Sequence, residues 1–270
     1  MKRIISILLA VIMVTFACSN NQVSATNDEN QSKEIVFADA GWDSIKFHNA
    51  IAGLIIEELY GYTWREVSGS TMVLHEGLLK GEIDIHMEVW SDNIASYDKD
   101  LADGKFQLLG TNFDDNYQGL YVPRYVIEGD PERGIEASAP DLRYVWDLKN
   151  YPELFPDTEV KGMGRIYGGI PGWAVDEALH KKYLHYELDE EFVYFRPGSD
   201  AALASAITSA YEKGEPIVAY YWEPTWLMGK YDLVLLEDKP NDGNAFVDGK
   251  TALPPVPVTI GMSIGFYADR

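Results

Sequence analysis

Short apolar segments typical of β-strands alternate with segments of helical periodicity from Glu34 onward. The clearest strand runs from Glu82 to Trp90, where apolar and polar residues alternate. A helix is predicted between Asp43 and Gly61, because apolar residues recur on one of its faces. These residues are Phe47, Ile51, Leu54, Ile55 and Leu59. The alternation predicts an α/β fold in which mostly parallel sheets of right-handed βαβ units are flanked by helices.

The length of the chain favours two such units. A chain of 270 residues is more often built on two cores than on one. The extended run Gln118–Val126 contains Pro123, which suits a hinge between lobes better than a central strand. The apolar segments Leu233–Leu236 and Val256–Ile260 are expected to return to the first lobe, so that the chain crosses twice. The predicted lobes are residues 34–122 with 226–270, and residues 123–225.

The amino-terminal residues predict export. Residues 1–17 combine a basic start with an apolar stretch too short to span a bilayer, as in a secretory signal peptide. Cys18, the only cysteine, follows at once, and residues 18–33 are polar. This order resembles a bacterial lipoprotein signal, with lipid attached to Cys18 and a flexible tether behind it; the alternative is a free cysteine in a plain signal peptide. A single cysteine excludes an intrachain disulfide.

Charge narrows the choice of partners. The formal net charge of −21 argues against nucleic acid and anionic membranes, which require basic surfaces. The sequence has no nucleophile elbow, phosphate-binding loop or metalloprotease motif, so no enzyme is predicted. No cofactor is predicted either.

Four tryptophans occupy matching places in the two predicted lobes. Trp42 and Trp173 each follow a glycine at a predicted strand-to-helix junction, whereas Trp90 and Trp222 each end a predicted strand. Ligands of open α/β sheets bind beyond the carboxyl ends of the strands, so we expect the four indoles to face one cleft. Indole faces attract cations, and a cage of them recognises quaternary ammonium groups.

A carboxylate site is expected beside this cage. The first amide groups of the predicted helix, near Trp42, Asp43 and Ser44, are available to an anion. A cage together with a helix N-terminus predicts a receptor for a betaine.

Five segments in order resemble the substrate-binding proteins of ABC importers for glycine betaine, proline betaine, choline and related osmolytes. The segments are Gly41–Ser44, Glu88–Trp90, Tyr121–Pro123, Gly168–Trp173 and Tyr221–Pro224. The resemblance implies a two-lobed venus-flytrap fold that closes on its ligand and presents it to a membrane permease. It also implies roles for particular side chains: Trp90, Trp173 and Trp222 in the cage, Trp42 as in the choline-type branch, and Tyr121 as a wall.

The chain departs from this family in two respects. It has no histidine close after Trp90 or Trp222, where some members hold the ligand carboxylate, which leaves Arg124, Arg165 and Arg196 as substitutes. It also ends directly after a predicted strand, where the family continues, so we expect a truncated sequence. The choice between glycine betaine, proline betaine, choline and carnitine stays open, as does that between a lipid-anchored and a periplasmic location.

Two alternatives from other classes remain. Asp84, His86 and Glu88 share a strand face and could hold a metal, although a polar face near a cleft is the simpler interpretation. Tryptophans also stack on sugars, but a carbohydrate-binding module would be an all-β sandwich with a flat aromatic platform.

Overall fold

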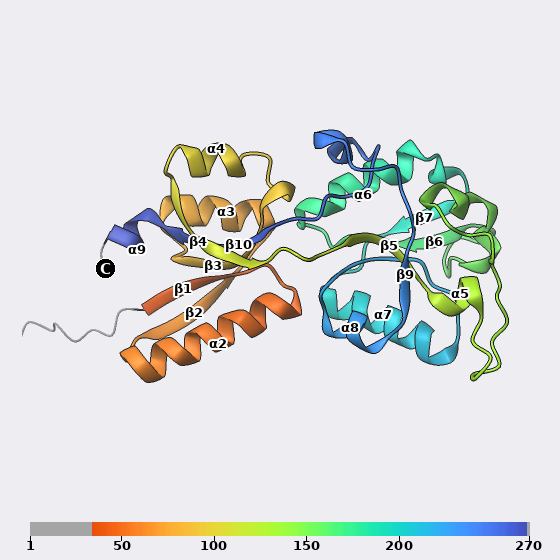
Figure 1. The fold of residues 1–270 in the computed structure, drawn as a ribbon, viewed down its shortest axis with the longest axis horizontal. Helices are drawn as coiled ribbons and strands as arrows, with labels where there is room; N and C mark the ends of the chain where they lie inside the picture. Colours follow the sequence, from red (N-terminus) through yellow and green to blue (C-terminus); the bar gives the residue numbers. More distant parts are fainter. Residues whose placement is uncertain (1–33, 269–270) are drawn as a thin grey trace, which may run out of the picture. The chain divides into compact units, whose positions relative to one another are not determined.

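The structure, a computed structural model, describes residues 34–268, which form two five-stranded sheets with helices on their faces (Figure 1). The predicted signal peptide (1–17), the lipid site Cys18 and the tether (18–33) lie outside the described residues. None of the helices between residues 34 and 268 combines the length and apolarity needed to cross a membrane.

The first sheet has the strand order β2-β1-β3-β10-β4. Its strands are β1 (Glu34–Asp39), β2 (Thr63–Ser68), β3 (Ile85–Trp90), β4 (Phe106–Phe113) and β10 (Val258–Ser263). Helix α2 lies on one side of this sheet, and α3 and α4 lie on the other (Figure 1). The helical segments are α2 (Asp43–Tyr60), α3 (Thr71–Lys80), η1 (Ser91–Asn93), α4 (Tyr97–Ala102) and α9 (Ile264–Ala268).

The second sheet has the order β7-β6-β8-β5-β9. Its strands are β5 (Gln118–Pro123), β6 (Gly164–Tyr167), β7 (Phe192–Phe195), β8 (Ala219–Trp222) and β9 (Leu233–Leu235). Helix α6 lies on one side and α7 and α8 on the other (Figure 1). The helical segments are α5 (Arg124–Glu128), η2 (Val145–Asn150), η3 (Pro152–Leu154), α6 (Ala174–His185), η4 (Leu188–Glu190), α7 (Asp200–Lys213), α8 (Trp226–Lys230) and η5 (Gly243–Asp248).

Both sheets are mixed. In the first, β1 pairs in parallel with β2 and β3, and in the second β6 pairs in parallel with β7 and β8. Strand β10 is antiparallel to its two neighbours, and so is β5. The predicted βαβ units thus account for three strands of each sheet. The antiparallel pairs are formed by β10 in the first sheet and by β5 in the second.

Two expectations were wrong, the hinge around Pro123 and the return of Leu233–Leu236 to the first lobe. The run around Pro123 is strand β5, which lies inside the second sheet between β8 and β9. Pro123 is its last residue and the N-cap of α5, so its missing N–H falls at the end of the ladder. The segment Leu233–Leu235 pairs with β5 and does not return to the first sheet, whereas Val258–Ser263 does return, as expected. The chain therefore crosses from the first sheet to the second at residues 114–117 and returns to the first sheet at residues 236–257.

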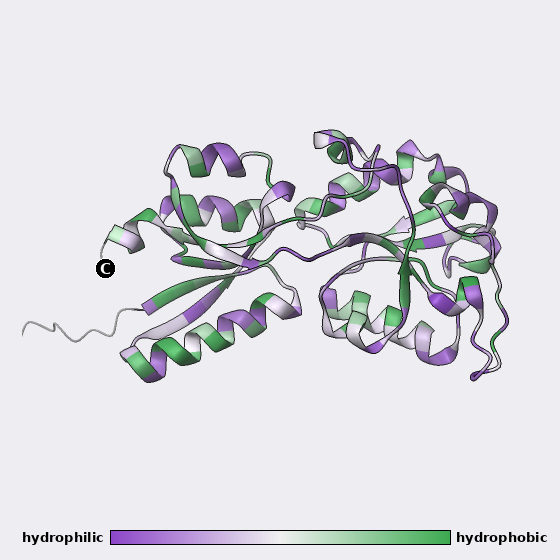
Figure 2. Cartoon of the chain, in the orientation of Figure 1, coloured by the Kyte–Doolittle hydropathy of each residue, from purple (hydrophilic) through white to green (hydrophobic). Residues whose placement is uncertain are grey.

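Helix α2 turns an unexpected face to its sheet. Its buried residues are Ile45, Asn49 and Gly53, and Gly53 lies so close to Trp64 of β2 that a Cβ atom would fall 2.2 Å from the indole. The five apolar residues that predicted the helix are all exposed, from 45% for Ile51 to 72% for Leu59. Figure 2 shows apolar residues, drawn in green, recurring along α2.

Candidate functional site

The two glycine-tryptophan pairs have the same local structure. Gly41 and Gly172 adopt φ values of 92° and 96°, which glycine tolerates because it has no Cβ atom. Trp42 is the N-cap residue of α2, and Trp173 is the N-cap residue of α6. Each pair therefore places an indole at the start of a helix, one in each half of the fold, as the sequence predicted.

The other two tryptophans end strands, again as predicted. Trp90 is the last residue of β3 and Trp222 the last residue of β8. Both are buried, with exposures of 7% and 4%. Each half of the fold, meaning one sheet with its helices, thus contributes one indole from a strand end and one from a helix start.

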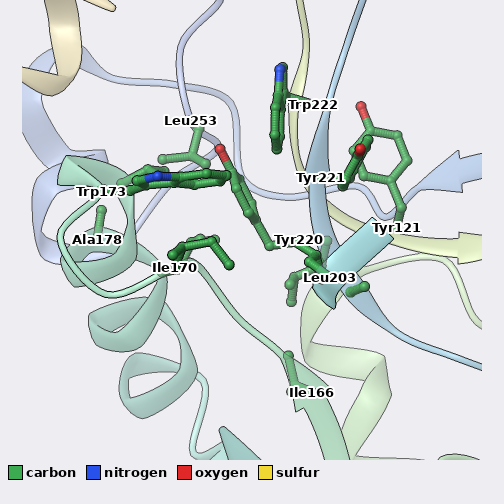
Figure 3. Close-up of a cluster of buried hydrophobic side chains, with 14 of the residues drawn as sticks. Tyr121, Ile166, Ile170, Trp173, Ala178, Leu203, Tyr220, Tyr221, Trp222 and Leu253 are labelled. Atoms are coloured by element: carbon green, nitrogen blue, oxygen red, sulfur yellow. The ribbon is translucent and has the colours of Figure 1, made fainter. Parts of the chain in front are cut away.

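The four indoles line one cavity. The Trp42 and Trp173 rings meet edge to face at 5.5 Å, and Trp173 meets Trp222 in the same way at 5.3 Å. Figure 3 shows Trp173 and Trp222 in one group with Tyr220, which also lines the cavity. The remaining lining residues are Thr71, His86, Glu88, Asn93, Ile94, Ala174 and Val175.

Hydrogen bonds hold two of the indoles. Trp42 Nε1 donates to Glu88 Oε2 at 2.6 Å, and Trp173 Nε1 donates to the carbonyl of Ala40, on the other half of the fold, at 2.9 Å. Trp222 Nε1 is buried and has no hydrogen-bond partner among the described residues. Two of the four indole N–H groups are therefore fixed by hydrogen bonds within the fold, and one of these bonds joins the two halves.

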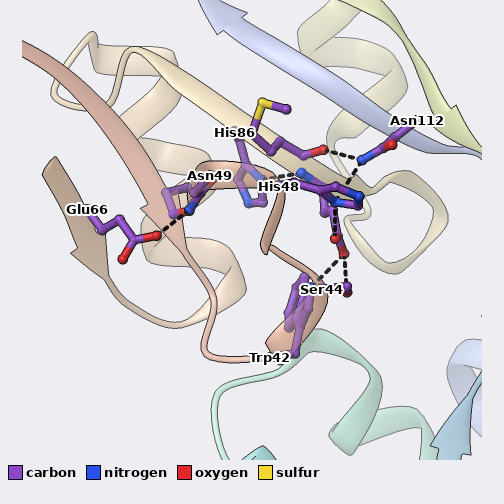
Figure 4. A network of polar contacts seen from close by, with 10 residues as sticks. Trp42, Ser44, His48, Asn49, Glu66, His86 and Asn112 are labelled. Atoms are coloured by element: carbon purple, nitrogen blue, oxygen red, sulfur yellow. Dashed lines mark hydrogen bonds and ion pairs between the residues drawn. The ribbon is translucent and has the colours of Figure 1, made fainter. Parts of the chain in front are cut away.

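Glu88 is the polar centre of the site and was not among the predicted ligand-binding residues. It is fully buried on β3 and accepts hydrogen bonds from Trp42 Nε1 and from Ser44 Oγ at 3.1 Å (Figure 4). His48 Nδ1 lies 2.6 Å from its other carboxylate oxygen. The period of the strand puts Glu88 on the same face as Trp90, a signal that the sequence carried.

His86 is the only histidine among the residues that line this cavity. Burial, followed by the nearby His75, lowers the pKa of His86 to about 3. Its ring is therefore neutral at physiological pH.

Tyr121, Asp43 and Ser44 do not line the tryptophan cavity. Tyr121 is buried in β5, and its hydroxyl donates to Glu223 at 3.0 Å. Asp43 and Ser44 line a neighbouring cavity of about 400 Å³, which shares Trp222 with the first.

The helix N-terminus expected to hold a ligand carboxylate already holds one from the protein. The backbone N–H of Asp43 donates to Asp200 Oδ2 at 3.0 Å. Asp43 and Asp200 are the first residues of α2 and α7, so the two helix starts face each other. Trp42 is the N-cap residue of α2, and its side chain makes no capping hydrogen bond.

The arginines proposed as partners of a ligand carboxylate are engaged elsewhere. Arg165 pairs with Asp157 at 2.7 Å, Arg124 with Asp232 at 2.9 Å, and Arg196 with Asp176 at 2.8 Å. None of the three lines either cavity.

The metal alternative receives no support from the geometry. Asp84 accepts a backbone hydrogen bond from Val36, and His86 Nδ1 accepts one from the backbone of Glu88. Within residues 34–268, no group of three or more His, Cys, Asp or Glu side chains is placed to hold a metal ion.

Solved structures of known proteins share this fold. Solved structures that superpose on it include ProX from Borrelia burgdorferi, a glycine betaine/L-proline-binding protein (TM-score 0.65, 20% identity, 88% of this chain and 77% of that one). Lactococcal OpuAC bound to glycine betaine gives a TM-score of 0.61 at 21% identity, over 88% and 80% of the two chains. An ABC-transporter choline-binding protein in complex with choline gives 0.63 at 20%, over 87% and 73%. These similarities establish the two-lobed α/β fold of periplasmic binding proteins.

Sequence comparison establishes the family. The glycine betaine/proline betaine-binding periplasmic protein of Escherichia coli (strain K12) is 30% identical over 211 residues, which are 74% of this chain and 60% of that protein. The match thus spans less than two thirds of the relative's length. The OpuAC family, described as the substrate binding domain of the ABC-type glycine betaine transport system, matches residues 33–269. The chain belongs to this family of ABC transporter substrate-binding domains.

Proposed function

We propose that this chain is the extracytoplasmic solute-binding component of an ABC importer and captures a quaternary ammonium osmolyte, such as glycine betaine, proline betaine, choline or carnitine. The observation that carries the proposal is the meeting of four indoles, two from each sheet, at one cavity. A quaternary ammonium group cannot donate a hydrogen bond, and aromatic faces are the surfaces that attract it. No catalytic step belongs to this function.

Binding would proceed by separation and closure of the two halves. All four indoles are buried, with at most 8% of each residue exposed, so the ligand enters when the indoles move apart. The backbone of Thr71 donates to the carbonyl of Gly172 at 3.0 Å, and Trp173 contacts Ala40. These contacts join the halves, and the crossings at residues 114–117 and 236–257 are the expected hinges. Closure would then bury the ligand between indoles of both sheets.

The remaining predictions concern the chain's surroundings. A membrane permease is the expected partner, because substrate-binding components deliver their ligand to one. Lipid attachment at Cys18, behind a signal peptide of residues 1–17, would keep the domain at the outer face of the cell membrane. Mass spectrometry of the protein purified from membranes would detect a lipid on an amino-terminal Cys18.

Isothermal titration tests the ligand class. We expect saturable binding of at least one quaternary ammonium osmolyte with a Kd of about micromolar, accompanied by a change in tryptophan fluorescence. Trp173→Ala should weaken binding about five- to thirtyfold, since one desolvated cation–π contact contributes about 1–2 kcal/mol. Trp146→Ala is the matched control, because Trp146 stacks on Tyr144 at 4.6 Å and lines neither cavity. Absence of binding by all four osmolytes, in folded protein, would contradict the proposal.

A further inference from the structure

Glu88 places a carboxylate in the wall of the tryptophan cavity. Its side chain is fully buried, and hydrogen bonds from Trp42 and Ser44 hold one of its oxygens in place. A buried carboxylate is stable only when hydrogen bonds or a positive charge compensate it. His48 is the only basic side chain that contacts Glu88 among residues 34–268, and it lies on the partly exposed side, with 27% of its side chain accessible. The carboxylate thus contacts Trp42 directly and lines the same cavity as the other three indoles.

Cationic side chains that could receive a ligand's own carboxylate are absent from this wall. Neither cavity has a lysine or an arginine among its lining residues. His86 is uncharged, and the amide of Asp43 already donates to Asp200. A zwitterion would therefore have to bury its carboxylate beside Glu88 with no cation to receive it, which is electrostatically unfavourable.

The neighbouring cavity is also lined by negatively charged side chains. It is lined by the carboxylates of Asp43 and Asp200 together with aromatic residues. Asp200 is 3% exposed, and its Oδ1 atom has no hydrogen-bond partner in the described part of the chain. Lys46 lies near enough to influence Asp200 but does not line the cavity. Trp222 therefore borders two cavities that are both lined by aromatic rings and carboxylates, and Asp200 Oδ1 is a buried acceptor without a partner among the described residues.

We propose that the site selects quaternary ammonium ligands of net positive charge, such as choline or a related amino alcohol, over zwitterionic betaines, and that Glu88 supplies the counter-charge. The inference rests on the proposed function and specifies its ligand. The indoles recognise the methylated nitrogen in either kind of ligand, whereas Glu88 distinguishes the net charge.

Ligands that differ only in charge test this on the unaltered protein. Glycine betaine and its methyl ester share the quaternary ammonium group, but the ester lacks the negative charge. We expect the ester and choline to bind at least about tenfold more tightly than glycine betaine. The neutral carbon isostere of choline, in which carbon replaces nitrogen, should bind more weakly than choline. Glycine betaine binding as tightly as its ester would overturn the inference and leave the proposed function standing. Failure of every quaternary ammonium ligand would remove both.

A variant pair tests the assignment to Glu88. Glu88→Gln keeps the shape of the side chain and removes its charge, so we expect choline affinity to fall at least about tenfold while glycine betaine affinity is unchanged or rises. Glu66→Gln is the matched control, because Glu66 also accepts a side-chain hydrogen bond, from Asn49, but lines neither cavity. Near-ultraviolet circular dichroism reports whether each variant is folded. An equal loss for both ligands in folded Glu88→Gln would show that Glu88 supports the cage without selecting charge; if the variant does not fold, the ester comparison decides alone.

Discussion

Helices α2 and α7 begin beside each other, but they bury different kinds of side chain. Their first residues meet through the hydrogen bond from the Asp43 N–H to Asp200. In α7, the apolar residues Leu203 and Ile207 are buried, and the N-cap side chain of Ser199 accepts the N–H of Ala202 at 3.2 Å. Helix α2 buries a mostly small or polar stripe, exposes its apolar stripe, and has no side-chain cap of its own.

The difference separates two sources of helix stability. Helix α7 is capped by its own sequence and packed along its apolar stripe, which is the usual origin of helical stability in proteins. Helix α2 depends on the close approach of Gly53 to Trp64 and on a carboxylate from the other half of the fold. Closure of the two halves is thus coupled to the start of α2, which carries Trp42.

The largest expected effect is the loss of packing beneath α7. Leu203 is fully buried, so Leu203→Ala should lower the free energy of unfolding by about 2–5 kcal/mol, because the substitution removes apolar contacts and leaves a cavity. Urea denaturation followed by circular dichroism measures this. A loss below about 1 kcal/mol would mean that the second sheet collapses around the gap, and the contrast with α2 would then fail.

Asp200 should make the stability depend on pH. Burial raises the pKa of Asp200 to about 6 from 3.8, and the neighbouring Asp43 adds to the increase, while the Asp43 N–H and Lys46 oppose it. The folded protein therefore binds this proton more tightly than the unfolded chain. The contribution of Asp200 to stability is largest below pH 4 and falls as pH rises from about 4 to about 6, by at most about 3 kcal/mol.

Asp200→Asn isolates that contribution, since the amide oxygen can still accept the Asp43 N–H. Unfolding free energies of variant and wild type, compared from pH 4 to 7, should diverge in favour of the variant by about 1–3 kcal/mol. Other carboxylates titrate in both proteins and cancel from the difference. A difference that stays constant with pH would show that Asp200 is not disfavoured as an anion, so that the two helix starts compensate its charge.

The sequence predicted the local features of the site because each depends on neighbouring residues. The glycine before Trp42, the glycine before Trp173 and the ends of the strands at Trp90 and Trp222 are visible as turns and periodicities. Glu88 was missed as a site residue because its partners Trp42 and His48 are 46 and 40 positions away in the chain. Strand β9 was misplaced for a similar reason: a three-residue apolar segment can pair in either sheet, and only its register with β5 decides.

The smallest effect is expected on the exposed face of α2. Leu54 is 54% exposed, and glutamine has a helix propensity close to that of leucine, so Leu54→Gln should change the unfolding free energy by no more than about 0.5 kcal/mol. The same urea titration measures it beside Leu203→Ala, which serves as the buried leucine of the pair. A loss above about 1.5 kcal/mol would mean that the apolar face of α2 is covered in solution. The contrast between the helices would then reflect which surface is covered, and not how each helix is stabilised.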